Sequence, residues 1–360
     1  MLSIDGGGIR GIIPATVLAE IEETCKAPVA TLFDLIVGTS TGGILALGLT
    51  APAEGRRPRN TAKALLDLYS LKAEAIFPGG GPPDWKQKIF GTRDPGDWLR
   101  HPGKIMMDSA QKVGSVLGGN KQFAGSARYF GTGLEETLDQ QIGDTPLSDA
   151  LTRVLITSYD VAYGQPVLFT SFKWPSQALI GVSMRVAARA TSAGPTYFEP
   201  QVLEVGSTQR VLVDGGVFAN NPSLIANTLG SVLAADANRP LLLVSLGTGT
   251  RNPAQPRTVT QIKTQNWLGT AKGVMEAAMT GTGELADMLL PGLMNLSGGP
   301  RRYYRIQTNV GQCNFEMDDS SPGNTQCLGL LAKQVVDSRR SDLLELCGSL
   351  AHGADAVPKS

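Results

Sequence analysis

The chain has 360 residues, of which 42% are hydrophobic and 18% charged, and its formal net charge at pH 7 is zero. This composition supports a sizeable hydrophobic core and excludes a globally disordered chain. The neutral balance, without a basic tail or a block of like charges, argues against a nucleic-acid-binding protein.

The cysteines and histidines are few and scattered. None of the four cysteines forms a C-x-x-C pair and the chain has only two histidines, so we expect no zinc site. We interpret the cysteines as reduced thiols of a cytoplasmic protein, and one disulfide, such as Cys313 with Cys327, stays open as the alternative. We expect no signal peptide, because Met1 leads directly into an apolar strand, and no transmembrane helix, because no apolar run reaches about 18 residues.

The N-terminal strand leads into a glycine-rich loop, Gly6-x-Gly8-x-x-Gly11. This spacing also occurs in dinucleotide-binding sites, but these need an acidic residue at the end of the next strand, whereas Asp34 precedes its strand. The other use of such a loop is as a nest of backbone N–H groups that stabilises an oxyanion. Arg10 could hold the shape of the loop, bind a substrate phosphate or form a surface salt bridge.

Residues 33–48 read as a short apolar strand, a tight corner and an apolar helix. The corner, Gly38-x-Ser40-x-Gly42, has the spacing of a nucleophile elbow, in which a serine is exposed between strand and helix. The next amide, of Thr41, lies at the helix N-terminus, where partial positive charge would stabilise an oxyanion. The alternative is an ordinary glycine-rich turn.

A helix is expected over residues 60–77, and the composition then changes. Residues 78–133 are rich in Gly and Pro and contain scattered aromatic and Met side chains. We interpret this stretch as a long loop or cap over the active face. It could be a partly apolar lid that meets lipid, or a cap packed on its own small core.

The middle of the chain alternates strands and helices. We expect a helix over 134–142, strands over 151–161 and 166–172, and a helix over 182–190 that ends in a corner of small residues, 190–198, near a site. The remaining expected elements are strands at 241–246 and 302–306, helices within 258–297 and a C-terminal helix at 328–350. No repeat or linker divides the chain, so we expect one domain over residues 1–360.

A second polar motif follows the strand expected at residues 210–213. Asp214 ends this strand and is followed directly by Gly215 and Gly216. In a mostly parallel sheet, a carboxylate at the carboxyl end of a strand lies on the same edge as Ser40. The alternative is a turn-forming Asp-Gly pair.

A serine nucleophile needs a base, and few candidates exist. His101 lies inside residues 78–133 and His352 lies near the chain end. The order Ser40, Asp214, His352 is that of an α/β-hydrolase triad, but the tail is expected to fray. The other arrangement is a dyad in which Asp214 itself accepts the proton, which requires a raised proton affinity or transfer concerted with attack.

Together these motifs resemble those of the patatin-like phospholipases and lipid acyl hydrolases. Residues 5–11 resemble the oxyanion loop of that family, residues 38–42 its nucleophile elbow and residues 214–216 the motif of its dyad aspartate. Further blocks that fit the family in the same order are residues 147–151, 190–198, 218–222, 244–249 and 303–307. Residues 78–133 and 250–300 do not match closely enough to carry anything over.

The resemblance implies an α/β fold, a three-layer α/β/α sandwich around a mostly parallel central sheet. It implies hydrolysis of fatty-acyl esters in phospholipids or related glycerolipids through a Ser40–Asp214 dyad, without metal or cofactor. The oxyanion hole would consist of backbone amides from Gly6, Gly7, Gly8, Ile9, Arg10 and Thr41. The motif glycines are Gly11, Gly38, Gly42, Gly215 and Gly216.

Two other functions stay open at this point. One is a soluble esterase for short acyl chains, and the other is a lipid- or nucleotide-binding module that uses the glycine loop without chemistry. For the favoured function we expect peripheral contact with a membrane that holds the lipid substrate. An activator protein, the positional preference and the head group are not predicted.

Overall fold

The computed structural model describes residues 1–78, 128–129, 131–173, 178–179, 181–238, 240–251, 271–295 and 302–354. Most of the cap expected at residues 78–133 falls outside this part of the chain, and so does His101. His352 lies in the last helix, but its side chain is outside the described part. Expectations about these residues therefore stay predictions.

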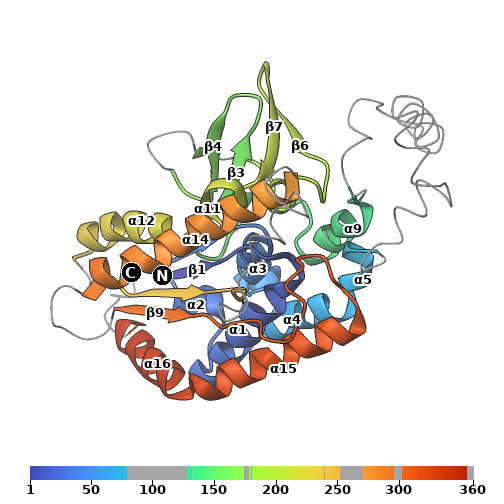
Figure 1. Cartoon of the computed structure of the whole chain (residues 1–360). Coiled ribbons are helices and arrows are strands. Elements are labelled where there is room, and N and C mark those ends of the chain that lie inside the picture. The colour runs from blue at the N-terminus through green and yellow to red at the C-terminus, as the bar shows by residue number, and fades with distance from the viewer. Residues whose placement is uncertain are drawn as a thin grey trace, which may run out of the picture.

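A mixed, mostly parallel sheet forms the centre of the fold, as expected (Figure 1). Its strand order is β5-β4-β3-β2-β1-β8-β9, and β7 also pairs with β3 and with β6. The parallel strands are β1 (Leu2–Ile4), β2 (Leu35–Gly38), β3 (Arg153–Asp160), β8 (Leu243–Leu246) and β9 (Tyr303–Ile306). The others are β4 (Gln165–Thr170), β5 (Ala178–Leu179), β6 (Gln201–Val205) and β7 (Thr208–Asp214).

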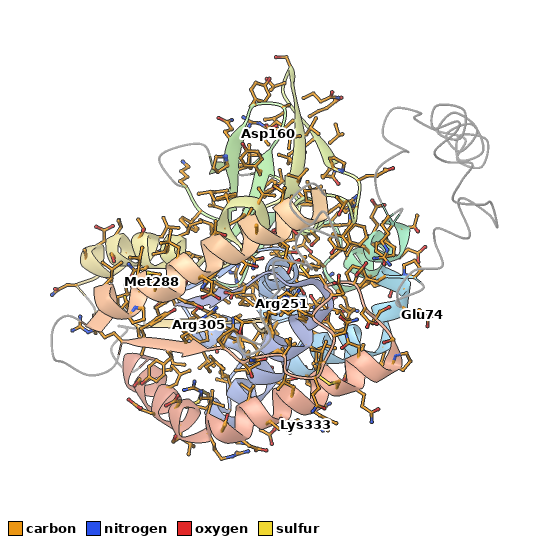
Figure 2. All side chains as sticks on the ribbon, viewed as in Figure 1. Glu74, Asp160, Arg251, Met288, Arg305 and Lys333 are labelled. Atoms are coloured by element: carbon orange, nitrogen blue, oxygen red, sulfur yellow. A yellow bond between two sulfur atoms is a disulfide. The ribbon has the colours of Figure 1, made fainter. Side chains whose placement is uncertain are left out.

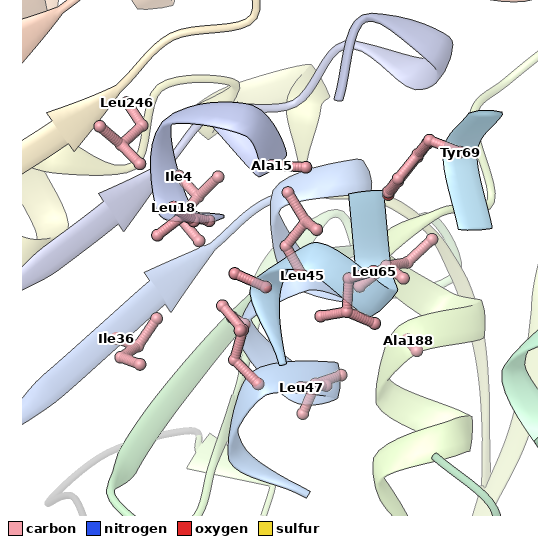
Figure 3. Close-up of a cluster of buried hydrophobic side chains, with 14 of the residues drawn as sticks. Ile4, Ala15, Leu18, Ile36, Leu45, Leu47, Leu65, Tyr69, Ala188 and Leu246 are labelled. Atoms are coloured by element: carbon pink, nitrogen blue, oxygen red, sulfur yellow. The ribbon is translucent and has the colours of Figure 1, made fainter. Parts of the chain in front are cut away.

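Helices cover both faces of the sheet because alternate residues of the strands point to opposite sides. Ile36 joins a core cluster with α1 (Ile12–Cys25), α3 (Thr41–Thr50), α4 (Ala62–Leu71) and α15 (Pro322–Ser338) (Figure 3). Its neighbours Leu35 and Val37 join the opposite cluster, with α12 (Ser223–Asp236) and α14 (Ala271–Asn295). The sheet is thus flanked by helices on each side, as the sequence predicts.

Strand β3 is longer than β2, and this difference positions the site. The first half of β3 pairs in parallel with β2, up to Gly38 opposite Ile156. Its second half pairs antiparallel with β7, where Ser158 lies opposite Asp214. β7 therefore approaches β2 end-on, and Asp214 reaches the end of β2 from the opposite direction. From the sequence, Ser40 and Asp214 are expected to lie on one edge of the sheet because their strands would be parallel. The two residues do lie together, but β7 runs antiparallel to β2, so the reason given is wrong.

Two of the expected helices are interrupted. The helix expected over 60–77 is divided into α4 and α5 (Ala73–Ile76), and the one expected over 328–350 is divided at Arg339 into α15 and α16 (Arg340–Ala354). The break after α15 lets α16 turn back against α1, which a single straight helix could not do. The other helices are α2 (Val29–Leu32), α9 (Thr132–Gln141), α10 (Met184–Thr191), α11 (Gly216–Ala219) and three short 3-10 segments, Gly8–Gly11, Glu54–Arg56 and Leu147–Asp149.

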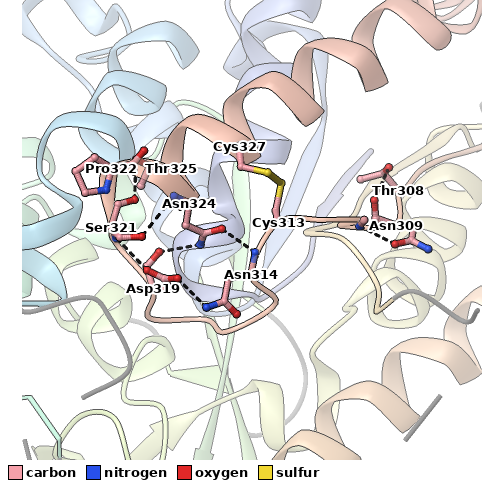
Figure 4. The surroundings of a disulfide bond; sticks show 11 residues. Thr308, Asn309, Cys313, Asn314, Asp319, Ser321, Pro322, Asn324, Thr325 and Cys327 are labelled. Atoms are coloured by element: carbon pink, nitrogen blue, oxygen red, sulfur yellow. Dashed lines mark hydrogen bonds between the residues drawn. A yellow bond between two sulfur atoms is a disulfide. The ribbon is translucent and has the colours of Figure 1, made fainter. Parts of the chain in front are cut away.

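All four cysteines form disulfides, so the expectation of reduced thiols is wrong. Cys313 pairs with Cys327 across 14 residues of sequence (Figure 4), and Cys25 pairs with Cys347 across 322. The spacing of the cysteines could not show that α16 folds back onto α1. Because disulfides form in oxidising compartments, the argument for a cytoplasmic location no longer holds. None of the helices in the described part of the chain is long and apolar enough to cross a membrane.

The two disulfides predict unequal effects on stability. In the chain-entropy model a cross-link stabilises more when it closes a longer loop, about 3 kcal/mol for 15 residues and about 6 for several hundred. We expect Cys25→Ser/Cys347→Ser to lower the free energy of unfolding more than Cys313→Ser/Cys327→Ser. Urea unfolding of both variants, with oxidised wild type as the reference, measures this. Equal losses, or none, would contradict the prediction.

Candidate active site

Ser40 stands at a strained corner between β2 and α3. Its backbone adopts φ 54° and ψ −125°, in a region that residues other than glycine rarely enter. Its N–H donates to the Thr191 hydroxyl oxygen at 2.8 Å, which fixes the corner to the end of α10. The residue is 8% exposed. This is the strand–corner–helix geometry that the elbow motif predicts.

The glycines of the elbow allow two backbone segments to cross. A Cβ atom at Gly38 would lie 2.4 Å from the carbonyl oxygen of Gly42, and one at Gly42 would lie 2.2 Å from the carbonyl oxygen of Ile4. Both distances are too short for real contacts. The other motif glycines are similarly crowded, and Cβ atoms would lie 2.3 Å from a neighbouring atom at Gly11, 2.2 Å at Gly215 and 2.5 Å at Gly216.

Asp214 lies buried beside Ser40, at the end of β7. Its Oδ1 accepts the Gly216 N–H at 2.7 Å, and the residue is 3% exposed. Burial raises the pKa of Asp214 to about 7, while hydrogen bonds from the Ser40 side chain and the Gly216 backbone oppose the rise. The structure thus brings together the two predicted residues, with a carboxylate whose pKa suits proton transfer near neutral pH.

Only part of the glycine loop is free to bind a ligand. The backbone amides of Gly6, Ile9 and Arg10 donate to protein carbonyl oxygens at 2.9, 2.8 and 3.2 Å. Within the described residues, no carbonyl accepts the amides of Gly7, Gly8 or Thr41. Gly8 and Thr41 also line the same cavity as Ser40. Three of the six predicted amides are therefore already engaged, and the loop and the elbow each contribute a free one at the cavity.

Arg10 holds the loop in shape. Its Nε donates to the Gly7 carbonyl at 3.3 Å and its Nη1 to the Gly249 carbonyl at 3.0 Å, while its guanidinium lies 4.0 Å from the centre of the Phe315 ring. Burial lowers the pKa of Arg10 to about 10, so it stays charged at neutral pH. Of the roles considered from the sequence, a surface salt bridge is wrong, since the residue is 5% exposed.

A buried ionic cluster, not predicted from the sequence, connects the loop to α14. Arg305 of β9 donates through its Nη2 to Asp5, directly before the loop, at 2.7 Å and to Asp287 of α14 at 3.1 Å. Its Nη1 also donates to the Ser245 hydroxyl at 2.9 Å. Figure 2 labels Arg305 between α14 and β9. Each partner comes from a different element, so no local pattern could have indicated the cluster.

The cavity in front of Ser40 and Asp214 has mostly apolar walls. Its hydrophobic lining consists of Ile44, Ile76, Phe77, Leu134, Val217, Phe198, Met275, Met279 and Met317. Methionine side chains are flexible and adapt to irregular apolar ligands. Met275 and Met279 lie four residues apart in α14, a spacing on one helix face that could have indicated their shared role. The cavity can therefore hold a hydrocarbon chain beside the hydroxyl of Ser40.

The corner at residues 190–198 lies at the site, which confirms the prediction for it. Thr191 accepts the Ser40 amide, and the Ala193 carbonyl accepts the Asp214 amide at 3.0 Å. Residues of this corner that line the cavity are Ser192, Gly194, Pro195, Tyr197 and Phe198. One short segment thus fixes both residues of the pair.

The fold and this site define an α/β protein with a serine elbow beside a buried aspartate. The chain matches the family model described as patatin-like phospholipase over residues 2–227, more than half of its length, and belongs to that family. It is therefore an enzyme of the patatin family of lipid acyl hydrolases and phospholipases, which confirms the resemblance seen in the sequence.

Two plant relatives agree with this assignment. The chain is 31% identical to patatin-like protein 2 of Oryza sativa subsp. indica, covering 95% of this chain and 84% of the relative. It is 30% identical to patatin-T5 of Solanum tuberosum, covering 93% and 83%. Among solved structures, human GIVD cytosolic phospholipase A2 overlaps 97% of this chain and 60% of its own, at 10% identity and a TM-score of 0.38.

The crossing at Gly42 makes a stability prediction with an internal control. Gly42→Ala places a methyl group against the Ile4 carbonyl, and we expect it to lower the free energy of unfolding by about 1–3 kcal/mol or more. Gly329→Ala, in the middle of α15 where a Cβ meets nothing within 4 Å, should raise it by about 0.5–1 kcal/mol. Chemical denaturation of both variants tests this. Similar effects of the two changes would contradict the crowding.

The raised pKa of Asp214 predicts a pH-dependent cost to stability. Between its usual value near 4 and about 7 the folded protein holds a proton that the unfolded chain has lost, so rising pH destabilises the native state. Asp214→Asn removes this titration. We expect the variant to gain stability over wild type as pH rises through this window and to keep a constant advantage above it. Denaturation curves from pH 4 to 9 measure the difference, and a difference that does not change with pH would refute it.

Proposed function

We propose that this protein releases fatty acids from phospholipids or related glycerolipids through a Ser40–Asp214 dyad and an acyl-enzyme intermediate. The observation that carries the proposal is the buried carboxylate of Asp214, with its pKa near 7, hydrogen-bonded to Ser40 at an apolar cavity. A carboxylate in water, with a pKa of about 4, is too weak a base to accept the proton of a serine hydroxyl. Burial raises the pKa of Asp214 and so makes it a stronger base.

In the first half of the reaction, the Ser40 hydroxyl attacks the acyl carbonyl carbon and its proton passes to Asp214. The carbonyl oxygen becomes an oxyanion, which accepts hydrogen bonds from the free amides of Gly8 and Thr41, with that of Gly7 available beside them. The N-terminus of α3 adds a favourable dipole at the same place. Each well-placed donor contributes about 3–4 kcal/mol to the stabilisation of such a transition state.

The second half regenerates the enzyme. The intermediate collapses, the ester C–O bond breaks, and the leaving alcohol takes the proton from Asp214. Water then attacks the acyl-enzyme and gives its proton to Asp214, the bond to Ser40 breaks, and Ser40 regains a proton as the fatty acid leaves. One carboxylate serves as base and acid in turn, so no histidine is needed.

The cavity favours long-chain lipid substrates over the alternative of short-chain esters. Its walls include flexible methionines and aromatic side chains, with Phe77 and Phe198 at a ring-centre distance of 5.7 Å, and the free energy of binding grows with the length of apolar chain that they cover. Such substrates lie in membranes, so the proposal includes peripheral membrane contact. The two disulfides favour action in an oxidising compartment.

Fatty-acid release from phospholipid vesicles in the presence of chelator tests the dyad. We expect Ser40→Ala and Asp214→Asn each to lower the rate by at least about a thousandfold, because each removes a group that acts in the transition state. The wild-type rate should rise with pH through about 7, as Asp214 loses its proton. A parallel assay with a monomeric short-chain ester separates a blocked membrane step from a dead site. Substantial turnover by Asp214→Asn would contradict the proposed dyad.

The two histidines provide the matched control. If Asp214 is the base, His101→Ala/His352→Ala should retain activity within about threefold of wild type, since neither imidazole takes part. The same vesicle assay measures it, together with stoichiometric labelling of Ser40 by an acyl-site phosphonate. A loss of several hundred-fold in the double variant would instead restore the triad with His352.

A further inference from the structure

The outer side of α14 exposes a stripe of large apolar side chains. Its large side chains are Val274, Leu285, Met288, Leu289 and Leu293, which are 55, 49, 75, 43 and 54% exposed. They make up five of the thirteen large hydrophobic side chains that are exposed in the described part of the chain. Other helices expose only single residues of this kind, which is normal for a protein surface, whereas a contiguous patch marks an interaction site.

Helical spacing places these residues on one side of α14. Residues 274, 281, 285, 288 and 292 are spaced three, four or seven positions apart, so they lie on one side of the helix. Two of them are glycines, Gly281 and Gly292, where a Cβ would meet nothing within 4 Å. The acidic residues Glu276, Glu284 and Asp287 of the same helix line a separate polar cavity. Glu276 and Asp287 also pair there with Arg251 and Arg305. The five large side chains of the stripe are themselves uncharged, and Glu284 is the acidic side chain exposed beside them in this helix.

The same helix lines the catalytic cavity. Met275 and Met279 contribute to the wall in front of Ser40. With a rise of about 1.5 Å per residue, Leu285 lies roughly 9 Å and Leu293 roughly 21 Å from Met279 along the helix axis. The exposed stripe and part of the wall of the apolar cavity that would receive the acyl chain thus belong to the same helix.

We propose that this outer stripe of α14 docks on the surface of the lipid bilayer and holds the catalytic cavity against it. The inference rests on the proposed function, because the lipid substrate of that cavity resides in the bilayer. An apolar strip on the helix that lines an acyl-binding cavity suits the interfacial region of a membrane, where affinity grows with buried apolar area. Of the acidic side chains of α14, Glu276 and Asp287 pair with Arg251 and Arg305, and Glu284 is exposed next to Leu285.

Binding to vesicles, separated from catalysis, tests the proposal. The Ser40→Ala protein is used so that the vesicles stay intact, and the vesicles consist of phosphatidylcholine alone so that net charge plays no part. We expect Met288→Glu/Leu289→Glu to lower the partition coefficient by about tenfold or more, and Met288→Ser/Leu289→Ser to lower it by a smaller factor. The control is Leu330→Glu/Leu344→Glu, which adds the same charge at residues 57 and 59% exposed on α15 and α16, across the sheet.

The outcomes separate the alternatives. An unchanged control beside a weakened α14 variant supports the proposal, and in the Ser40 enzyme the same variant should lose vesicle hydrolysis while keeping turnover of a monomeric short-chain ester. Equal binding by the α14 variants and the parent protein would overturn it. So would a dimer, seen by light scattering, that the α14 change dissociates, because the stripe would then face a second copy. If wild type hydrolyses neither substrate while its binding still depends on α14, the proposed function fails and the docking surface stands.

Discussion

The site depends on keeping one carboxylate away from water. Removing solvent from Asp214 raises its pKa to about 7, as the proposed proton transfer from Ser40 requires, and the same desolvation penalises the folded state. The surrounding backbone sustains this arrangement: the Gly216 amide binds the carboxylate, and Ala193 accepts the backbone amide of Asp214. The burial that the proposed chemistry requires of Asp214 therefore lowers the stability of the folded protein. The two hydrophobic clusters, one on each face of the sheet, offset this loss of stability.

The mixed sheet brings Asp214 next to Ser40 in a way that a purely parallel sheet would not. Ser40 follows the end of β2. In a purely parallel sheet, a carboxylate could reach Ser40 only from the end of a neighbouring strand. Here β3 extends beyond the end of β2, and β7 pairs with this extension while running in the opposite direction to β2. The last residue of β7, Asp214, therefore lies next to the elbow. Thr157, one residue before Ser158 in β3, binds Thr39 at 2.7 Å and would clash with any Cβ at Gly215. A single strand therefore aligns both halves of the site.

What the sequence can predict here follows from how local each feature is. The elbow at Ser40, the glycine loop and the aspartate at Asp214 are defined by backbone needs within a few residues, so their glycines identify them. The amides of Gly6 and Ile9 are engaged by Asn220 and Met317, and Asp5 by Arg305, partners more than two hundred residues away. An apolar run before Asp214 indicates a strand but cannot show that β7 runs antiparallel to β2. The pairing of Cys25 with Cys347 likewise depends on the turn at Arg339.

That last pairing changes the covalent topology of the molecule. With Cys25 joined to Cys347, nearly the whole chain forms one closed ring that contains both Ser40 and Asp214. A protease that cuts the backbone once anywhere within the ring opens it without separating the pieces. After such a cut, Ser40 and Asp214 would still belong to one covalently linked molecule. The two residues could therefore come together again without the association of two separate fragments. Ring closure thus protects the assembled site against cleavage in a way that the noncovalent core alone does not.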